Sequence, residues 1–345
     1  MTAFKTEIEP FDTLFFKDGK SFDAADSSAA EVVFPPSPSV FFGALRTAFS
    51  RKNSSGIPLL NTEIDPTNNL IIHQITLADK QTTYFPIPMD CIVDKNGDIH
   101  TLELEEMQKS TLSSHKLPAI LKSNHHFKSH DEGFWYLDNT LFDEYLSGKT
   151  LNGKKAVNLA QRIVKETKIG NKGDQNTGTV EEGGLYTKQV IRLVDLHFEI
   201  IHSGLDIKRI NWLMLGGESR FAALRSENIE FTVNNISLEK NKLYKLYLHT
   251  PSIFLNTEKE CISEPNSFLA EKGLSLLAAA TGRAQYIGGW DMQKRKPKPM
   301  YKAVSAGSVF YIKNESDQVI SIPQQGSISN RYTEQGFGLY NLISI

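Results

Sequence analysis

The most constraining feature of this chain is the order of short apolar segments in its last third. An alternating apolar run at 243–249 leads into a helix-forming stretch at 266–280, for which Gly282 is a suitable C-terminal stop. Three strand-like segments follow, at 284–288, 300–312 and 339–345. A strand, a helix and then further strands form the core of a ferredoxin-like (RRM-like) unit. We therefore expect an α+β fold with such a domain at 240–345.

The first 235 residues repeat part of this pattern. A strand at 4–16, broken near Pro10, should precede a helix that begins after Pro35-Pro36-Ser37-Pro38. Ser37 suits the N-cap and Pro38 the first helical position. We expect a second ferredoxin-like domain at 1–235, with an insertion at 95–150 whose segment 100–130 carries one or two short helices. Strands are further expected at 70–77, 83–93, 134–137, 190–201, 212–215 and 229–236, with a helix through 139–146 capped by Asn139.

A long Gly-rich basic segment interrupts this N-terminal part. Between Lys154 and Arg192 the chain holds eight basic and four acidic residues, and five glycines fall between 170 and 184. That stretch has one aliphatic residue, Val180, and cannot form its own core. We expect either a mobile loop or a projecting hairpin. Loops of this length are usually functional or disordered. The segment is either a clamp over a polyanion, with Lys168 as a contact, or an ordinary solvated insertion.

Composition excludes several classes of protein. The 345 residues are 40% hydrophobic and 23% charged, with a formal charge of −2, so any nucleic-acid site must be a local patch. Two distant cysteines, Cys91 and Cys261, argue against a disulfide scaffold and a zinc-thiolate site. The N-terminus does not have the pattern of a signal peptide, and no apolar run is long enough to cross a membrane. We expect a cytoplasmic protein.

The familiar catalytic and cofactor motifs are missing from the sequence. Gly148-Lys149-Thr150 has the ending of a P-loop, but Asp143 stands where that loop needs glycine. His125, His126 and His130 are the one metal-like cluster, and they do not have the glutamate that follows the first histidine in metallohydrolases. We favour a polar surface insertion there, and we predict neither a metal, a cofactor nor a catalytic residue.

The segment most informative about function is a basic loop near the C-terminus. Five bases and no acid lie between Lys294 and Lys302, and Trp290 and Tyr301 flank them. Cations that hold phosphates beside aromatic rings that stack on bases are typical of single-stranded RNA binding. The alternative is a solvated basic loop with Trp290 packed in the core. The candidate RNA contacts are Trp290, Lys294, Arg295, Lys296 and Lys298.

A second candidate site lies where the first helix begins. The N–H groups and positive dipole end of a helix bind phosphate, although the same residues also suit a well-capped core helix. Lys17 and Lys20 would approach this site, with Phe22 as a stacking partner. The further candidates are Ser37, Arg46 and, beside the turn 216–221, Arg220.

Five segments match one family pattern in order. They are DTLFFKDGKSF at 12–22, FPPSPSVFFGALRTA at 34–48, TVEEGGLY at 179–186, GGWD at 288–291 with KPKP at 296–299 and AGSV at 306–309, and GFG at 336–338. In these segments the chain resembles the third subunit of the Cmr complex, the RAMP-module effector of type III-B CRISPR systems. It departs from the family at Lys20-Ser21, at Lys296 and at Ser305, where Arg-Pro, Arg and Pro are usual. A Lys for Arg keeps the charge but loses bidentate phosphate recognition.

The resemblance implies a function as well as a fold. It implies two ferredoxin-like domains with Gly-rich loops, and a subunit without catalytic activity that grips the 5′ handle of the CRISPR RNA (crRNA). One copy per hetero-oligomeric complex would contact the large polymerase/cyclase-type subunit and the backbone. A thumb-like hairpin, for which 154–192 is the candidate, would separate handle from guide.

Two other functions fit the same residues. One is a metal-free endoribonuclease that processes CRISPR RNA on this fold, with one histidine as general base. The other is a protein-only scaffold whose basic loops meet acidic neighbours and which has no affinity for RNA at physiological salt.

Overall fold

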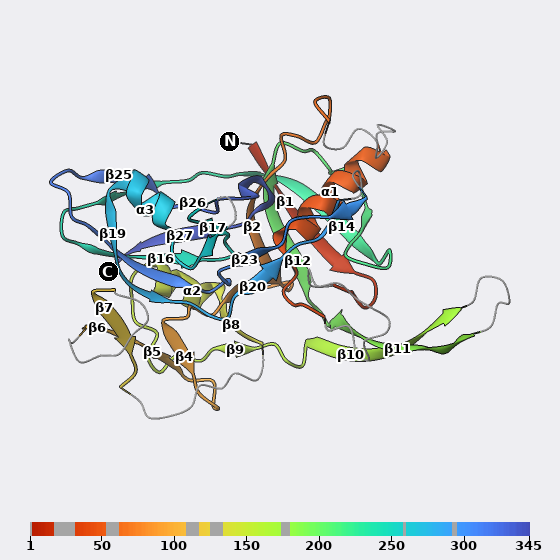
Figure 1. Cartoon of the computed structure of the whole chain (residues 1–345), viewed down its shortest axis with the longest axis horizontal. Helices are drawn as coiled ribbons and strands as arrows, with labels where there is room; N and C mark the ends of the chain where they lie inside the picture. The colour runs from red at the N-terminus through yellow and green to blue at the C-terminus, as the bar shows by residue number, and fades with distance from the viewer. Residues whose placement is uncertain are drawn as a thin grey trace.

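Two antiparallel sheets, one of eight strands and one of five, form the body of the chain in the computed structural model (Figure 1). The structure describes residues 2–16, 32–52, 62–107, 117–124, 134–173, 180–257, 260–291 and 295–345. Within these ranges there are three α-helices among many strands, which confirms the expected α+β class. None of these helices has the length and apolar character needed to cross a membrane.

The eight-stranded sheet contains the first half of the chain. Its strands, in spatial order, are β13 (Trp212–Met214), β14 (Phe221–Glu230), β1 (Thr2–Pro10), β12 (His197–Ser203), β2 (Ile71–Ala78), β3 (Thr83–Pro86), β8 (Trp135–Asp138) and β9 (Val157–Asn158). Within it, β14, β1, β12 and β2 are the fourth, first, third and second of a set of four in chain order. The helix α1 (Pro38–Lys52) connects the first of these strands to the second.

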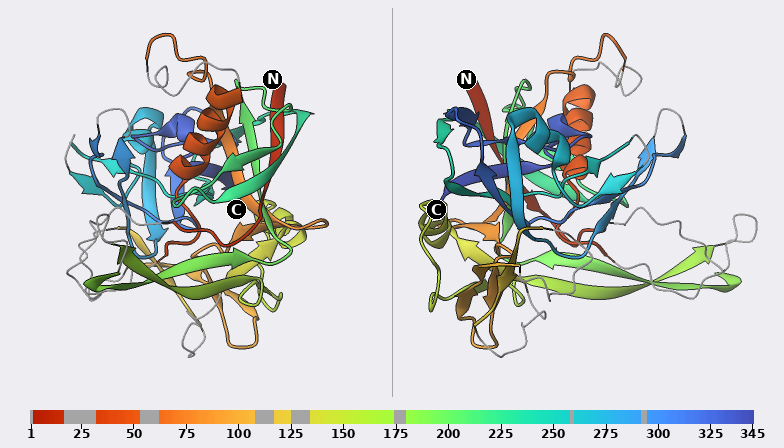
Figure 2. Two further views of the ribbon diagram at one scale, coloured as in Figure 1. Left: turned by 90° about the vertical axis from the view of Figure 1, so that its right-hand side faces the viewer. Right: turned by 60° about the vertical axis from the view of Figure 1, so that its left-hand side comes forward.

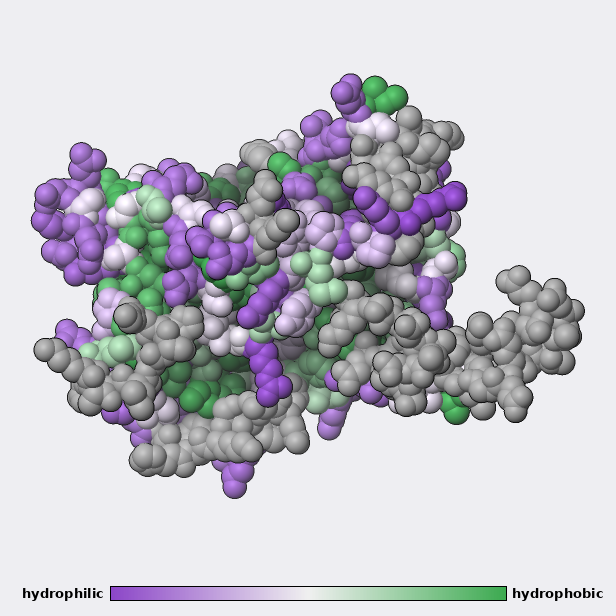
Figure 3. All heavy atoms as spheres, viewed as in Figure 1, coloured by the Kyte–Doolittle hydropathy of each residue, from purple (hydrophilic) through white to green (hydrophobic). Residues whose placement is uncertain are grey.

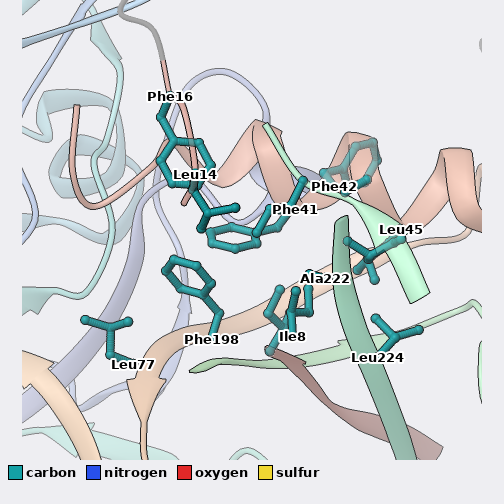
Figure 4. Close-up of a cluster of buried hydrophobic side chains, with 14 of the residues drawn as sticks. Ile8, Leu14, Phe16, Phe41, Phe42, Leu45, Leu77, Phe198, Ala222 and Leu224 are labelled. Atoms are coloured by element: carbon teal, nitrogen blue, oxygen red, sulfur yellow. The ribbon is translucent and has the colours of Figure 1, made fainter. Parts of the chain in front are cut away.

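The helix α1 forms where the sequence predicts it, and its apolar face closes the first core. Phe41 and Leu45 are fully buried, and they face Ile8, Phe198 and Leu224 of the sheet (Figure 4). The rings of Phe41 and Phe198 lie 4.9 Å apart, close to edge-on. Burying such a side chain contributes about 2–3 kcal/mol, so these contacts fix the helix on the sheet.

The five-stranded sheet has the same internal order. Its strands are β19 (Leu274–Ala280), β24 (Val309–Asn314), β16 (Leu243–Leu248), β27 (Leu339–Ser344) and β26 (Gln325–Ser327). Here β27, β16, β24 and β19 are the fourth, first, third and second strands, and α3 (Asn266–Lys272) connects the first to the second. The two sheets therefore share one strand order and one helical crossover.

The helix predicted at 266–280 is wrong in its second half. It ends at Lys272, because Gly273 adopts the left-handed conformation, with φ +64°. Residues Leu274–Ala280 then form β19, which pairs with β24. Leucine and alanine favour helices, but pairing with a central strand outweighs that local preference.

In the part of 100–130 that the structure describes, strands are found where short helices were expected. They belong to two small hairpins, β4 (Cys91–Val93) with β5 (Ile99–Thr101) and β6 (Glu103–Glu106) with β7 (Ala119–Lys122). The helix α2 (Asn139–Leu146) follows as predicted, although Asp138 rather than Asn139 caps it by accepting the N–H of Leu141 at 2.8 Å.

This insertion packs on the five-stranded sheet. Phe142 and Tyr145 of α2 share a buried cluster with Tyr247, Val309 and Ile343. The carboxylate of Asp90 lies fully buried at this contact. The 95–150 region, which matched nothing in the family pattern, therefore covers one face of the C-terminal sheet.

The segment 154–192 forms a projecting hairpin, as one of its two interpretations predicted. Its strands β10 (Ile163–Gly173) and β11 (Val180–Leu193) pair with each other and extend far from the body (Figures 1 and 2). The predicted strand 190–201 is thus two strands, because β11 ends at Leu193 and β12 begins at His197 after Asp195, which has φ +52°.

Two other predicted strands are divided in the same way. The segment 229–236 splits into the end of β14 and β15 (Asn235–Leu238), which pairs with β25 (Ile320–Pro323). The segment 300–312 splits into β23 (Tyr301–Ala303) and β24 around a turn with Gly307 at φ +85°. The remaining elements are β17 (Phe254–Leu255), β18 (Cys261–Ile262), β20 (Gln285–Ile287), β21 (Trp290–Asp291), β22 (Lys296–Pro297) and the 3-10 helix η2 (Thr333–Gln335).

Candidate nucleic-acid interface

A small cavity lies between the start of α1, the eight-stranded sheet and the loops that follow β16 and β23. Pro35, Pro36 and Pro38 form one wall, and the opposite side includes Gln285 at the start of β20 and Ala306 after β23. The space is about 60 Å³ and its lining is largely apolar. Two sequence blocks that lie more than 250 positions apart, the proline turn and the AGSV segment, therefore line one cavity. A space of this size and apolarity is too small for a whole nucleotide.

His249 also lines this cavity. Its Nε2 bonds the side chain of Asn341, and its Nδ1 is buried without a hydrogen-bond partner among the described residues. Burial lowers the pKa of His249 to about 3. The ring is therefore neutral at physiological pH and offers a hydrogen bond rather than a positive charge.

Ser37 stands at the entrance to the helix beside the cavity. Its carbonyl accepts the N–H of Val40 at 2.9 Å, as expected for a residue at the helix start, and its hydroxyl lies 3.0 Å from that of Ser39. The structure thus confirms where α1 begins and places Ser37 near, but not among, the residues that line the cavity.

An exposed basic ribbon extends from the other side of the cavity. We use this name for Arg283, Arg295, Lys296, Lys298 and Lys302, which lie on or beside the two-stranded pairs β20–β23 and β21–β22. Arg295, Lys296 and Lys302 are exposed, and no described acidic side chain forms an ion pair with any of the five bases. These cations are therefore available to phosphates, which is the property the sequence predicts for the 294–302 loop.

Tyr286 supplies an exposed aromatic ring on this ribbon. It lies directly across the β20–β23 pair from Lys302, and 51% of it is exposed. Directly opposed residues of an antiparallel pair point to the same face. A solvent-facing ring beside a lysine can stack on a base while the lysine holds the phosphate. The sequence alone did not identify Tyr286, because its face is shown only by its pairing with Lys302.

Several predicted contacts fall outside what the structure describes. Lys17, Lys20 and Phe22 lie in the range 17–31, and Lys294 lies in 292–294, both outside the described residues. The backbone of Trp290 is described, as the partner of Pro297 in the β21–β22 pair, but its side chain is not. These five remain predictions.

Lys168 and Arg220 come together at the root of the long hairpin. We call the group the hairpin-base cluster; its members are Asp12, Thr13, Glu166, Lys168, Lys188, Arg192, Glu218 and Arg220. Lys168 donates to the hydroxyl of Thr13 at 2.7 Å, and the guanidinium groups of Arg192 and Arg220 lie 3.1 and 3.6 Å from the carboxylate of Asp12. The segment after β1 is thus held between the hairpin and the β13–β14 turn.

The charges in this cluster are largely compensated. The pKa of Asp12 is lowered, first by a hydrogen bond from the N–H of Thr13 and also by Lys168 and Arg192. Arg192 likewise lowers the pKa of Glu166, and Lys188 lowers that of Glu218. Four bases face three acids that stay ionised, so the cluster fixes the direction of the hairpin more than it offers free cations.

Arg46 has a structural role in the described fold. Its guanidinium pairs with the buried Asp65 and donates to Thr67 at 2.7 Å, and 13% of its side chain is exposed. It also lies over the ring of Phe42 at 5.1 Å. This pair joins α1 to the loop at 62–70, and the contact of Arg46 with RNA stays a prediction.

The described residues hold no group of three or more histidines, cysteines or acids arranged to bind a metal ion. His125, His126 and His130, for which we favoured a polar surface insertion over a metal site, lie outside those residues. Of the other histidines, His202 is bonded to the hydroxyl of Thr6 at 2.9 Å and His73 to that of Ser203 at 2.8 Å.

Both basic projections lie on one side of the molecule. In the right-hand view of Figure 2 the blue strands near residue 295 and the green hairpin β10–β11 extend in the same direction. In the space-filling view of Figure 3, purple hydrophilic side chains at the centre of the face lie among white and green ones. An extended polyanion could contact the ribbon and the hairpin together.

Comparison with known proteins adds a family and a fold. A family model described as "CRISPR-associated protein (Cas_Cmr3)" matches residues 6–345. A chain in a cryo-EM structure of the type III-B Cmr-beta bound to cognate target RNA is 20% identical over 89% of this chain and 86% of that chain, with a TM-score of 0.51. A chain in the same complex with target RNA and AMPPnP, state 1, is 18% identical over the same shares, with a TM-score of 0.48. No curated protein matches the chain.

Proposed function

Because the chain belongs to the Cas_Cmr3 family of CRISPR-associated proteins, we propose that it is the RNA-binding subunit of a type III-B effector complex. In this role it is not an enzyme. It holds the 5′ handle of the crRNA and joins the large polymerase/cyclase-type subunit to the backbone subunits, with one copy in each cytoplasmic complex.

The fold proposal is that residues 1–235 and 240–345 form two ferredoxin-like domains. The shared strand order supports it, since both sheets place their fourth, first, third and second strands side by side with a helix between the first and the second. The hairpin β10–β11 would be the thumb that separates handle from guide, and the hairpin-base cluster would keep it in one direction.

One observation carries the RNA-binding proposal: the bases of the basic ribbon, which form no ion pair with a described acid, lie beside the exposed ring of Tyr286. The five bases of the ribbon have no acidic partner among the described residues, whereas the bases of the hairpin-base cluster and Arg46 are paired with acids. The ribbon also adjoins the cavity lined by the proline turn, so two of the family-like blocks lie at one place.

Binding of a repeat-derived RNA to the purified complex, measured over a salt series, tests the proposal. The variant R295A/K296A/K298A removes three exposed or half-exposed bases. Each phosphate contact on a single strand contributes about 0.7 to the slope of log affinity against log salt, so the slope should fall by about two. Y286A should weaken binding with the slope unchanged, because stacking displaces no counterions.

The matched control is K240A/K242A/K272A. It removes the same charge from bases that already pair with Asp317, Glu239 and Glu271 on the surface. If this control lowers the slope as much as the ribbon variant does, general charge rather than the ribbon binds RNA, and the assignment fails.

The endoribonuclease alternative predicts RNA cleavage without metal. A general base works best with a pKa near 7, whereas burial lowers the pKa of His249 to about 3 and that of His202 to about 4. Cleavage of repeat RNA by pure protein in EDTA, abolished by a single His→Ala change, would establish the alternative. The scaffold alternative instead predicts that neither RNA nor a salt-dependent affinity is found in the purified complex.

A further inference from the structure

A groove runs between the C-terminal end of α1 and the edge strand β13. Ten residues line it, and they enclose about 310 Å³. One wall is the last turn of the helix with Arg51 and Lys52, and the floor is the strand Trp212–Met214. The left-hand view of Figure 2 shows α1 lying beside the green strands of this sheet edge.

The strand β13 has an open hydrogen-bonding edge. Its single neighbour among the described strands is β14, and the bonds from Leu215 N to Arg220 O and from Leu224 N to Asn211 O fix which residues face that neighbour. In an antiparallel pair these positions alternate. The N–H and C=O of Trp212 and Met214 therefore point outward, while those of Leu213 point to β14.

The edge of β13 is short, at three residues, and its own side chains are neutral. An open edge is a template for another strand unless charges, proline or a covering element block it. The three residues of β13 include no charge and no proline. Trp212 and Phe221 beside it are 51% and 46% exposed, and their rings contact each other at 5.3 Å.

The rim of the groove is positive. Arg51, Lys52 and Arg209 contribute three bases, and none of the ten lining residues is acidic. An extended segment that fills the groove would gain from carboxylates opposite these bases. Outward carbonyls, in contrast, need N–H donors, which a polypeptide backbone supplies and a phosphate backbone does not.

We propose that β13 and the α1 groove bind an extended acidic segment of a partner protein, which adds as a strand to the eight-stranded sheet. The inference rests on the proposed function in one respect, since the partner is a protein subunit of the same complex. Main-chain bonds to Trp212 and Met214 give affinity, and Arg51 and Arg209 select an acidic sequence.

Residue-resolved hydrogen exchange of the free chain and of the assembled complex tests the proposal. The amides of Trp212 and Met214 should exchange at least about ten times more slowly in the complex, because strand pairing protects them. The amide of Leu213 is the internal control, since it faces β14 in both states. RNA added to the free chain should not change any of the three.

Variants give an independent readout on the tagged complex. R51E/R209E should reduce the amount of the partner retained at least about ten-fold, and K240E/K242E, on a distant surface, should leave it unchanged. M214P removes an outward N–H and leaves the ladder to β14, so it should lose the partner with the chain still folded.

Three results overturn the proposal. They are an assembled complex in which Trp212 and Met214 are not protected, protection of these amides by RNA alone, and full retention of the partner by R51E/R209E. Each of them refutes the groove and leaves the proposed function standing. A preparation that contains neither partner proteins nor RNA refutes the proposed function, and the groove proposal falls with it.

Discussion

The buried charge pair between Asp90, directly before β4, and Lys245 of the C-terminal sheet yields a quantitative prediction. The Nζ of Lys245 lies 2.8 Å from Oδ2 of Asp90, whose side chain is fully buried, and 11% of the Lys245 side chain is exposed. The hydroxyls of Tyr145 and Tyr311 donate to the same carboxylate at 3.0 and 2.9 Å. Burial, together with the charge of Asp90, raises the pKa of both tyrosines, so they remain donors.

Replacing Lys245 by Met should lower the free energy of unfolding by about 3–5 kcal/mol, the usual cost of leaving one buried charge unpaired. An exposed pair would cost less than about 1 kcal/mol. The double variant D90N/K245M should be more stable than K245M alone, because the introduced amide is neutral and its carbonyl still accepts one of the tyrosine hydroxyls.

Urea denaturation followed by far-UV circular dichroism measures these differences. Coupling between the two positions should be at least about 2 kcal/mol in the double-mutant cycle. The matched control is K154M, which breaks the exposed pair of Lys154 with Glu144 on α2. The reasoning is refuted if K245M and K154M cost the same, or if the D90N/K245M double variant is the least stable.

Three further outcomes follow from particular residues. Burial lowers the pKa of His202 from 6.5 to about 4, so its contribution to stability should be complete above pH 6.5 and fall by about 3 kcal/mol towards pH 4; because the pKa of His249 is lowered in the same direction, H202Q should make a pH–stability curve less steep there, and an unchanged curve would contradict it. G43A should gain about 1 kcal/mol, because the glycine is inside α1 with open space around it, whereas G204A should cost at least about 2 kcal/mol, because a Cβ would lie 1.7 Å from the carbonyl oxygen of Asn69; thermal melts rank the two. R46A should cost about 3 kcal/mol and leave RNA affinity per folded molecule unchanged; lost affinity with full stability would restore Arg46 as an RNA contact.

Local signals in the sequence predicted the elements that have local causes. The proline turn and the apolar repeat place α1 at Pro38–Lys52, and the Gly-rich basic segment becomes the projecting hairpin. The predictions failed where a tertiary contact determines the secondary structure. Residues 274–280 have helical composition but pair with β24, and the glycine at 273 was the available signal.

The candidate site was predicted in part for the same reason. An excess of like charge over nine residues identified Arg295, Lys296 and Lys298, which the structure places without acidic partners among the residues it describes. The role of Arg46 could not be read in this way, because its partner Asp65 lies in a loop 19 residues later. Tyr286 was missed because only its place across from Lys302 shows which face it occupies.

The contact between α2 and the five-stranded sheet constrains how the chain can be synthesised and folded. Phe142 shares its core with Ile343, which is made 201 residues later. At a synthesis rate of about 5–20 residues per second, the apolar surface around Phe142 stays uncovered for roughly 10–40 seconds before Ile343 is made. The two halves are therefore a poor choice for separate expression, and a nascent chain paused before β27 is a natural client for a chaperone that shields apolar surface.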